Sequence, residues 1–143
     1  MIEVPLGPKD NPESWRRIRE FIAEFPDDDY WSEWKQMVRD VVCALEALGL
    51  APLFRVGQSM HHVILSTTAR HGLNDEPRVT LEFKPKQQLV RIAYGCTNLC
   101  FNEPLSQEYA APSMAVQSIL RNLRRLWRET KPDIPIPDAL NSP

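Results

Sequence analysis

From position 78 to position 84, polar and apolar side chains alternate without exception in the stretch RVTLEFK, and LVRIAY (89–94) continues the pattern after a short polar connection. Successive side chains of a strand point to opposite faces of a sheet, so this alternation predicts an antiparallel hairpin with one buried face. A buried sheet face has to be covered by another layer. The rest of the chain must supply that layer.

Three other segments have helical rather than alternating spacing. Apolar side chains recur at steps of three and four along residues 11–25, 34–48 and 112–130, which predicts a helix in each. Asn11 followed by a proline is a typical helix start, and Gly49 supplies the left-handed residue that ends the second helix. Pro12 and Pro112 lie at helix starts, and none of the other eleven prolines lies within a predicted helix, where a proline would cost about 3 kcal/mol.

A second hairpin is predicted upstream of the first. LFRV (53–56) and MHHVILSTT (60–68) flank GQS (57–59), where we place the turn. NLCFN (98–102) is a candidate fifth strand. The predicted fold class is therefore α+β: two N-terminal helices, a four-stranded or five-stranded antiparallel meander sheet and one C-terminal helix, with the helices packed on one sheet face.

The composition is that of one globular domain, with 143 residues, 43% of them apolar and 25% charged. We expect a single domain over residues 1–143, with its core in about 10–130 and an extended proline-rich tail at 131–143. We expect neither an export signal nor a membrane span. Three cysteines do not make a disulfide framework, so free thiols and a cytoplasmic location are expected.

All three histidines lie within eleven residues. His61 and His62 are neighbours on a predicted strand and point to opposite faces, so the pair is poorly placed to hold one ion. A metal site would require His61 and His71 to converge with Cys96 or Cys100. A small metal-dependent enzyme built on these residues is the alternative hypothesis. Because the chain has no C-x₂-C pair and no H-E-x-x-H motif, we expect no metal and no cofactor.

Other catalytic signatures are also missing. GQSMH (57–61) departs from the G-x-S-x-G nucleophile elbow at its last position, and a strand rather than a helix is predicted to follow. The five glycines are too scattered to build a phosphate-binding loop. The sequence therefore favours a binding protein over an enzyme.

PDDDYWSEW (26–34) has the most unusual composition in the chain. One interpretation is a helix start, in which Asp28 or Asp29 caps the helix and the acids complement its dipole. That interpretation leaves Trp31 unexplained, and aromatic anchors are typical of protein interfaces. The predicted partner-binding residues come from this segment and from the sheet face away from the helices. They are Asp27, Asp28, Asp29, Tyr30, Trp31, His62, Ile64 and Arg91.

RNLRRLWR (121–128) places Arg121, Arg124, Arg125 and Arg128 on one helix face, which is a candidate anion-binding surface. A solvated helix face is the simpler interpretation. Nucleic-acid binding through these arginines is a second alternative, but the net charge of −2 argues against it.

The leading hypothesis is a non-catalytic cytosolic protein-interaction module, such as an inhibitor, an immunity-type factor or a chaperone-like factor. Its expected partner is another protein, or a second copy of the chain bound through the open sheet face. A membrane partner is not expected.

Overall fold

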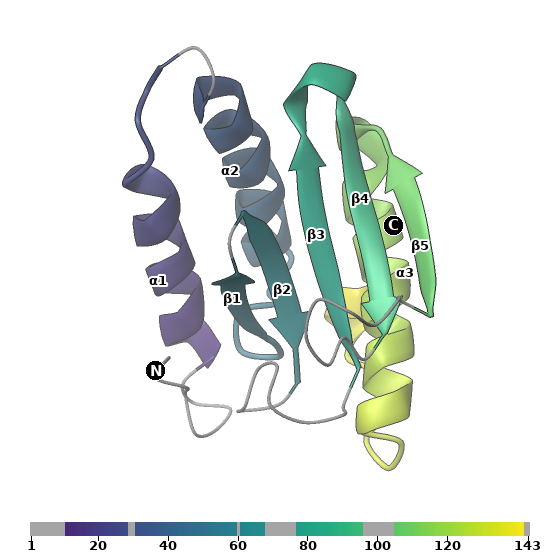
Figure 1. Cartoon of the computed structure of the whole chain (residues 1–143). Coiled ribbons are helices and arrows are strands. Elements are labelled where there is room, and N and C mark those ends of the chain that lie inside the picture. The colour runs from purple at the N-terminus through teal and green to yellow at the C-terminus, as the bar shows by residue number, and fades with distance from the viewer. Residues whose placement is uncertain (1–10, 29–30, 60, 68–76, 96–104, 142–143) are drawn as a thin grey trace.

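The computed structural model describes residues 11–28, 31–59, 61–67, 77–95 and 105–141, and Figure 1 shows the arrangement of their elements. The helices are α1 (Asn11–Ala23), α2 (Trp31–Ala47) and α3 (Pro112–Thr130), with short 3₁₀ helices η2 (Pro85–Gln87) and η3 (Asp138–Asn141). The strands are β1 (Arg55–Ser59), β2 (His62–Ser66), β3 (Arg78–Lys84), β4 (Leu89–Gly95) and β5 (Ser106–Ala110).

The sheet is an antiparallel meander in the order β1-β2-β3-β4-β5. Val63, Leu81 and Ile92 form one cross-strand row, and all three belong to a core that also contains buried residues of α1, α2 and α3. The helices therefore cover one face of the sheet, with α2 and α3 behind it in Figure 1. The predicted α+β fold is confirmed.

Helix α1 lies along the edge strand β1 and satisfies backbone groups there. The Ser14 hydroxyl accepts a hydrogen bond from the Val56 N–H at 3.0 Å, and the Trp15 indole Nε1 donates to the Phe54 carbonyl oxygen at 2.9 Å. Buried backbone groups without partners are costly, and an exposed sheet edge invites pairing with other chains. α1 thus closes this edge of the sheet.

The first hairpin turns later in the chain than the sequence predicted. Gly57 pairs with Ile64 and Ser59 pairs with His62, so residues 57–59 belong to β1 instead of forming the turn. Glycine is a weak strand former, but strand propensity depends on context. The adjacent Val56 pairs with Leu65, and both side chains are buried. This pairing outweighs the low strand propensity of Gly57.

The fifth strand of the sheet is β5, which pairs with β4. Ala110 of β5, for example, lies opposite Val90 of β4. The candidate strand at 98–102 lies outside the described residues. Since SQEYA is mostly polar and mostly exposed, β5 lacks the alternation that revealed β3 and β4. Its strand conformation comes from pairing with β4 rather than from its own pattern.

The tail was predicted to be extended and outside the core, and both expectations are wrong for its last part. Residues 138–141 form η3, and Leu140 is fully buried in the core. The Trp127 indole donates to the Ile134 carbonyl oxygen at 3.1 Å, and Arg124 Nη1 donates to the Leu140 carbonyl oxygen at 2.6 Å. The prolines favour an extended backbone, but the tail packs on α3 because Leu140 is buried against that helix.

The stop signal of α2 and both ends of α3 are confirmed, whereas α1 ends at Ala23 instead of residue 25 and α2 begins at Trp31 instead of residue 34. Gly49 has φ +86°, the left-handed conformation expected after a helix end. α3 begins at Pro112 and ends at Thr130, as predicted. No helix in the described ranges combines the length and apolar character needed to cross a bilayer.

Candidate functional site: a pocket at the start of α2

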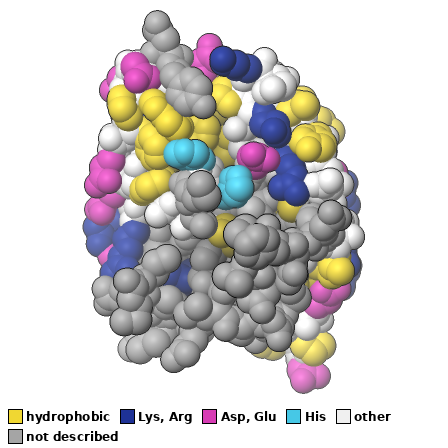
Figure 2. Space-filling model, viewed as in Figure 1, with side chains coloured by type: hydrophobic (Ala, Val, Ile, Leu, Met, Phe, Trp, Pro, Cys, Tyr) yellow, Lys and Arg dark blue, Asp and Glu magenta, His cyan; other side chains and the backbone are white. Residues whose placement is uncertain are grey.

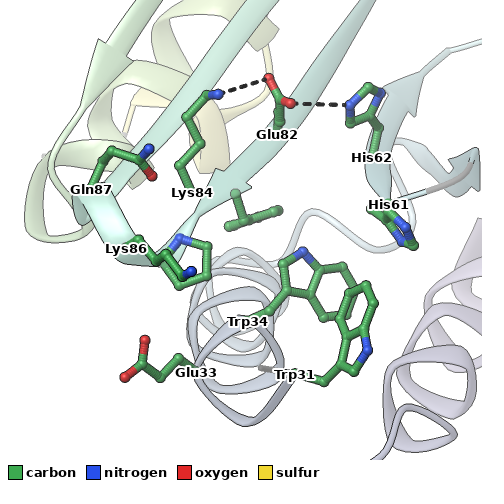
Figure 3. A pocket seen from close by; sticks show the side chains of 11 residues that line it. Trp31, Glu33, Trp34, His61, His62, Glu82, Lys84, Lys86 and Gln87 are labelled. Carbon is green, nitrogen blue, oxygen red and sulfur yellow. Dashed lines mark ion pairs between the residues drawn. The ribbon is translucent and has the colours of Figure 1, made fainter. Parts of the chain in front are cut away.

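A pocket of about 390 Å³ lies where the first turn of α2 meets the turn after β1 and the turn after β3. Figure 3 shows the indoles of Trp31 and Trp34 on one side and the side chains of Glu82 and Lys84 opposite them. Three separate parts of the chain therefore build it.

The acidic segment begins α2 and sets the position of Trp31. The Asp28 carboxylate accepts a hydrogen bond from the Trp31 N–H at 2.8 Å, which confirms the predicted capping by Asp28. α2 thus starts at Trp31, so Trp31 and Trp34 are one helical turn apart and neighbours on its surface. Their ring centroids are 5.6 Å apart, with the planes nearly perpendicular.

Asp27 also has a structural contact. Its carboxylate pairs with Lys35 Nζ at 2.7 Å, and the same ammonium donates to the Phe25 carbonyl oxygen at 2.8 Å. The hydrogen bond from Lys35, followed by its charge, holds the pKa of Asp27 below its usual value. Because Lys35 is only 5% exposed, it needs this carboxylate. Asp29 and Tyr30, the other predicted residues of the segment, lie outside the described residues.

Trp31, Trp34 and His61 line one wall of the pocket, and together with Phe25 they form an aromatic cluster. Their ring centroids are 4.6 Å (Phe25–Trp34), 4.8 Å (Phe25–Trp31) and 4.9 Å (Trp31–His61) apart. Trp34 is 5% exposed, whereas Trp31 is half-buried and His61 exposed. Trp34 is therefore held in place by its surroundings, whereas Trp31 and His61, which pack beside it, expose ring surface to solvent.

The opposite wall carries a row of polar and ionisable side chains on the sheet face away from the helices. His62 Nε2 lies 3.6 Å from Glu82 Oε2, and Lys84 Nζ lies 3.9 Å from Glu82 Oε1. Because β2 pairs with β3, His62 and Glu82 face each other directly. In Figure 2 the two cyan histidines lie between a hydrophobic patch and this charged group.

The sequence placed both histidines on one strand, but His61 lies in the turn before β2, which begins at His62. The His61 ring lies against Trp31, with centroids 4.9 Å apart, His62 faces Glu82, and both histidines line the pocket. Within the described ranges, no three His, Cys, Asp or Glu side chains are grouped to hold a metal. His71, Cys96 and Cys100, the other members of the predicted metal set, lie outside those ranges. The metal hypothesis therefore stays a prediction.

The sheet face away from the helices is less open than expected. Ile64 is 8% exposed and Ala93 5%, although neither belongs to the core between the sheet and the helices. The prediction that Ile64 is an exposed contact residue is therefore wrong, because its side chain is buried. Arg91 is half-buried, and its Nε donates to Gln107 Oε1 at 2.7 Å.

The arginines of α3 have separate contacts rather than forming one shared anion site. Arg121, Arg124 and Arg125 each have a different partner, and Arg128 is exposed. The partners are the Glu108 carboxylate for Arg121, the Leu140 carbonyl oxygen for Arg124, and the Tyr94 ring with the Glu129 carboxylate for Arg125. These contacts account for three of the four side chains, while anion binding by the face stays a prediction.

Sequence reasoning missed the pocket residues that follow β3. Pro85 begins η2, and Gln88 has φ +54° after it, which turns the chain back into β4. Lys86 and Gln87 consequently lie at the pocket rim. A proline within a short polar connection does indicate a turn. Nothing in that pattern indicates that the turn faces α2.

No protein-family model, no curated protein and no solved structure matches the chain.

Proposed function

We propose that this chain is a non-catalytic protein-interaction module that receives an apolar side chain of its partner in the pocket beside Trp31. One observation carries the proposal: the fold brings Trp31 and His62 into the same pocket. The sequence had identified these residues as binding candidates for unrelated reasons, the first as an unexplained aromatic in an acidic segment and the second as a polar residue on a sheet face.

The chemistry of the pocket suits a side chain better than a charged ligand. Its volume of about 390 Å³ is near the low end of the roughly 300–1,000 Å³ typical of ligand sites. The aromatic cluster supplies a large apolar contact area of the kind found in interface hot spots. Two acids, Glu33 and Glu82, and two lysines, Lys84 and Lys86, balance each other around it. The rim therefore offers hydrogen bonds without favouring either sign of charge.

The proposal includes a cytosolic location and a partner that is a different protein. Cys43 is an exposed free thiol, which is compatible with a reducing compartment. An inhibitor, an immunity-type factor or a chaperone-like factor would each use such a pocket. A second copy of the chain is the other occupant to be tested.

A photo-crosslinking residue at position 87 tests this directly. Gln87 is exposed at the pocket rim, and Gln117 is an exposed glutamine on α3 that provides the matched control. In cells that produce the chain natively, we expect one protein to be crosslinked from position 87 and not from position 117. Crosslinking from position 117 alone would contradict the proposal, and a crosslinked dimer of the chain would replace the foreign partner with a second copy.

A further inference from the structure

Arg55, at the start of β1, is a buried cation that has no ion pair with another described residue. It is 6% exposed, and its Nε and Nη1 atoms are buried without a hydrogen-bond partner among the described residues. These two atoms carry three of the five N–H donors of a guanidinium, which stays charged at any ordinary pH. A buried charge without a partner is strongly unfavourable, so a group that satisfies Arg55 is needed.

A second buried arginine, Arg78, lies near Arg55 in the sheet. Arg55 of β1 pairs with Ser66 of β2. Leu65, the residue before Ser66, pairs with Val79 of β3. Because β2 and β3 are antiparallel, Ser66 lies opposite Arg78, so Arg55, Ser66 and Arg78 form one cross-strand row. Arg78 is 7% exposed. This row lies on the sheet face away from the helices. Two buried guanidinium groups therefore flank Ser66 at one end of that face.

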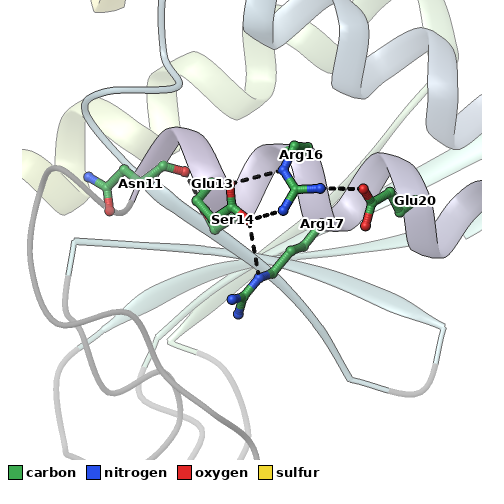
Figure 4. Close-up of polar contacts among 6 residues, drawn as sticks. All are labelled: Asn11, Glu13, Ser14, Arg16, Arg17 and Glu20. Carbon is green, nitrogen blue, oxygen red and sulfur yellow. Dashed lines mark hydrogen bonds and ion pairs between the residues drawn. The ribbon is translucent and has the colours of Figure 1, made fainter.

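Arg17 of α1 adds a third cation. Burial, and then the nearby charge of Arg17, lower the pKa of Arg55 from its usual value. Figure 4 shows Arg16 between Glu13 and Glu20, whereas Arg17 approaches Glu13 alone, with its Nε 3.7 Å from Glu13 Oε1. Because Glu13 also pairs with Arg16, it compensates Arg17 only in part.

We propose that Arg55, together with Arg17, binds an oxyanion of the phosphate class supplied from outside the chain. Three unused donors on a buried guanidinium match a group that accepts several charge-assisted hydrogen bonds at once. The nearby charge of Arg17 favours an anion with more than one negative charge. This site lies at the α1 edge of the sheet, does not share residues with the Trp31 pocket, and stands independently of the proposed protein-binding function.

Thermal unfolding with and without inorganic phosphate, at constant ionic strength set with chloride, tests the site. A ligand that binds only the folded state stabilises it. The Tm of the wild-type chain should therefore rise by roughly 5–10 °C at a hundredfold excess of phosphate over its Kd. Arg39→Gln, which removes an exposed arginine of α2 outside the candidate anion-binding surface of α3, should show the same rise. Arg55→Met should show none.

The same variants in chloride alone separate a free oxyanion from a carboxylate of the chain itself. If no group of the chain balances Arg55, Arg55→Met removes an unpaired buried charge and its Tm in chloride should equal or exceed that of the wild type. A much lower Tm for Arg55→Met in chloride would indicate an internal carboxylate and overturn the proposal. So would an equal phosphate shift in wild type and Arg55→Met, or no shift in the wild type.

Discussion

Trp15→Ala is expected to lower the free energy of unfolding by about 3–5 kcal/mol, as measured by urea denaturation. Trp15 is fully buried between α1 and the sheet, and its indole satisfies the Phe54 carbonyl oxygen. The substitution leaves a large cavity and a buried carbonyl group without its donor. Since small domains have about 5–15 kcal/mol of stability in total, a loss of this size brings the chain close to unfolding.

Trp15→Phe separates the two contributions. It keeps most of the apolar volume and removes the hydrogen bond to Phe54, so a smaller loss of about 1–3 kcal/mol is expected. Cys43→Ala, at an exposed position on α2, should stay within about 0.5 kcal/mol of the wild type. If Trp15→Ala cost no more than Cys43→Ala, α1 would not be docked on β1 as described.

The elements with strong periodicity were predictable from the sequence. β3 follows from strict alternation and β4 from its apolar residues at every second position, and α2 and α3 follow from apolar stripes with recognisable end signals at Gly49 and Pro112. Each of these segments has one face that must be buried, and its own residues specify which one. Local pattern and tertiary packing agree in them.

The mispredicted elements depend on residues far away in the chain. β5 is polar and acquires its conformation by pairing with β4, and Gly57 continues a strand because its neighbours pair with β2. Leu140 is one apolar residue in a proline-rich tail, and only its contact with α3 shows that it belongs to the core. Hairpin register and edge pairing are not encoded by composition in these short segments.

Some residues of the pocket could be predicted from the sequence, but their convergence in one place could not. Trp31 and His62 were both identified as binding candidates, but His61 was placed on a strand, whereas it lies in the turn before β2. Their convergence depends on the register that sets His62 opposite Glu82 and on the η2 turn that faces α2. Ile64 was misjudged because alternation tells which face a side chain is on and not whether that face is covered.

Trp31→Ala is expected to weaken binding to the partner at least 30-fold, as measured by titration calorimetry with the protein identified by crosslinking. A central aromatic anchor contributes at least about 2 kcal/mol at an interface, which corresponds to this factor. Trp31 is half-buried and is not part of the innermost core, so the variant should remain folded. Circular dichroism at the temperature of the titration checks this.

Tyr109→Ala is the matched control for that loss. Tyr109 is 53% exposed on β5, in the same cross-strand row as His62, Glu82 and Arg91 but at the other end of the sheet. Its removal should change the Kd less than threefold. Equal losses for Trp31→Ala and Tyr109→Ala would indicate binding across the sheet face instead of at the pocket.

Hydrogen–deuterium exchange of the chain with and without its partner maps the occupied surface without any substitution. Binding at the pocket predicts slower exchange in the first turn of α2, residues 31–35, and in the turn after β3, residues 84–88, when the partner is bound. Unchanged exchange in both segments, with protection in β5 or along residues 121–128 of α3, would contradict it.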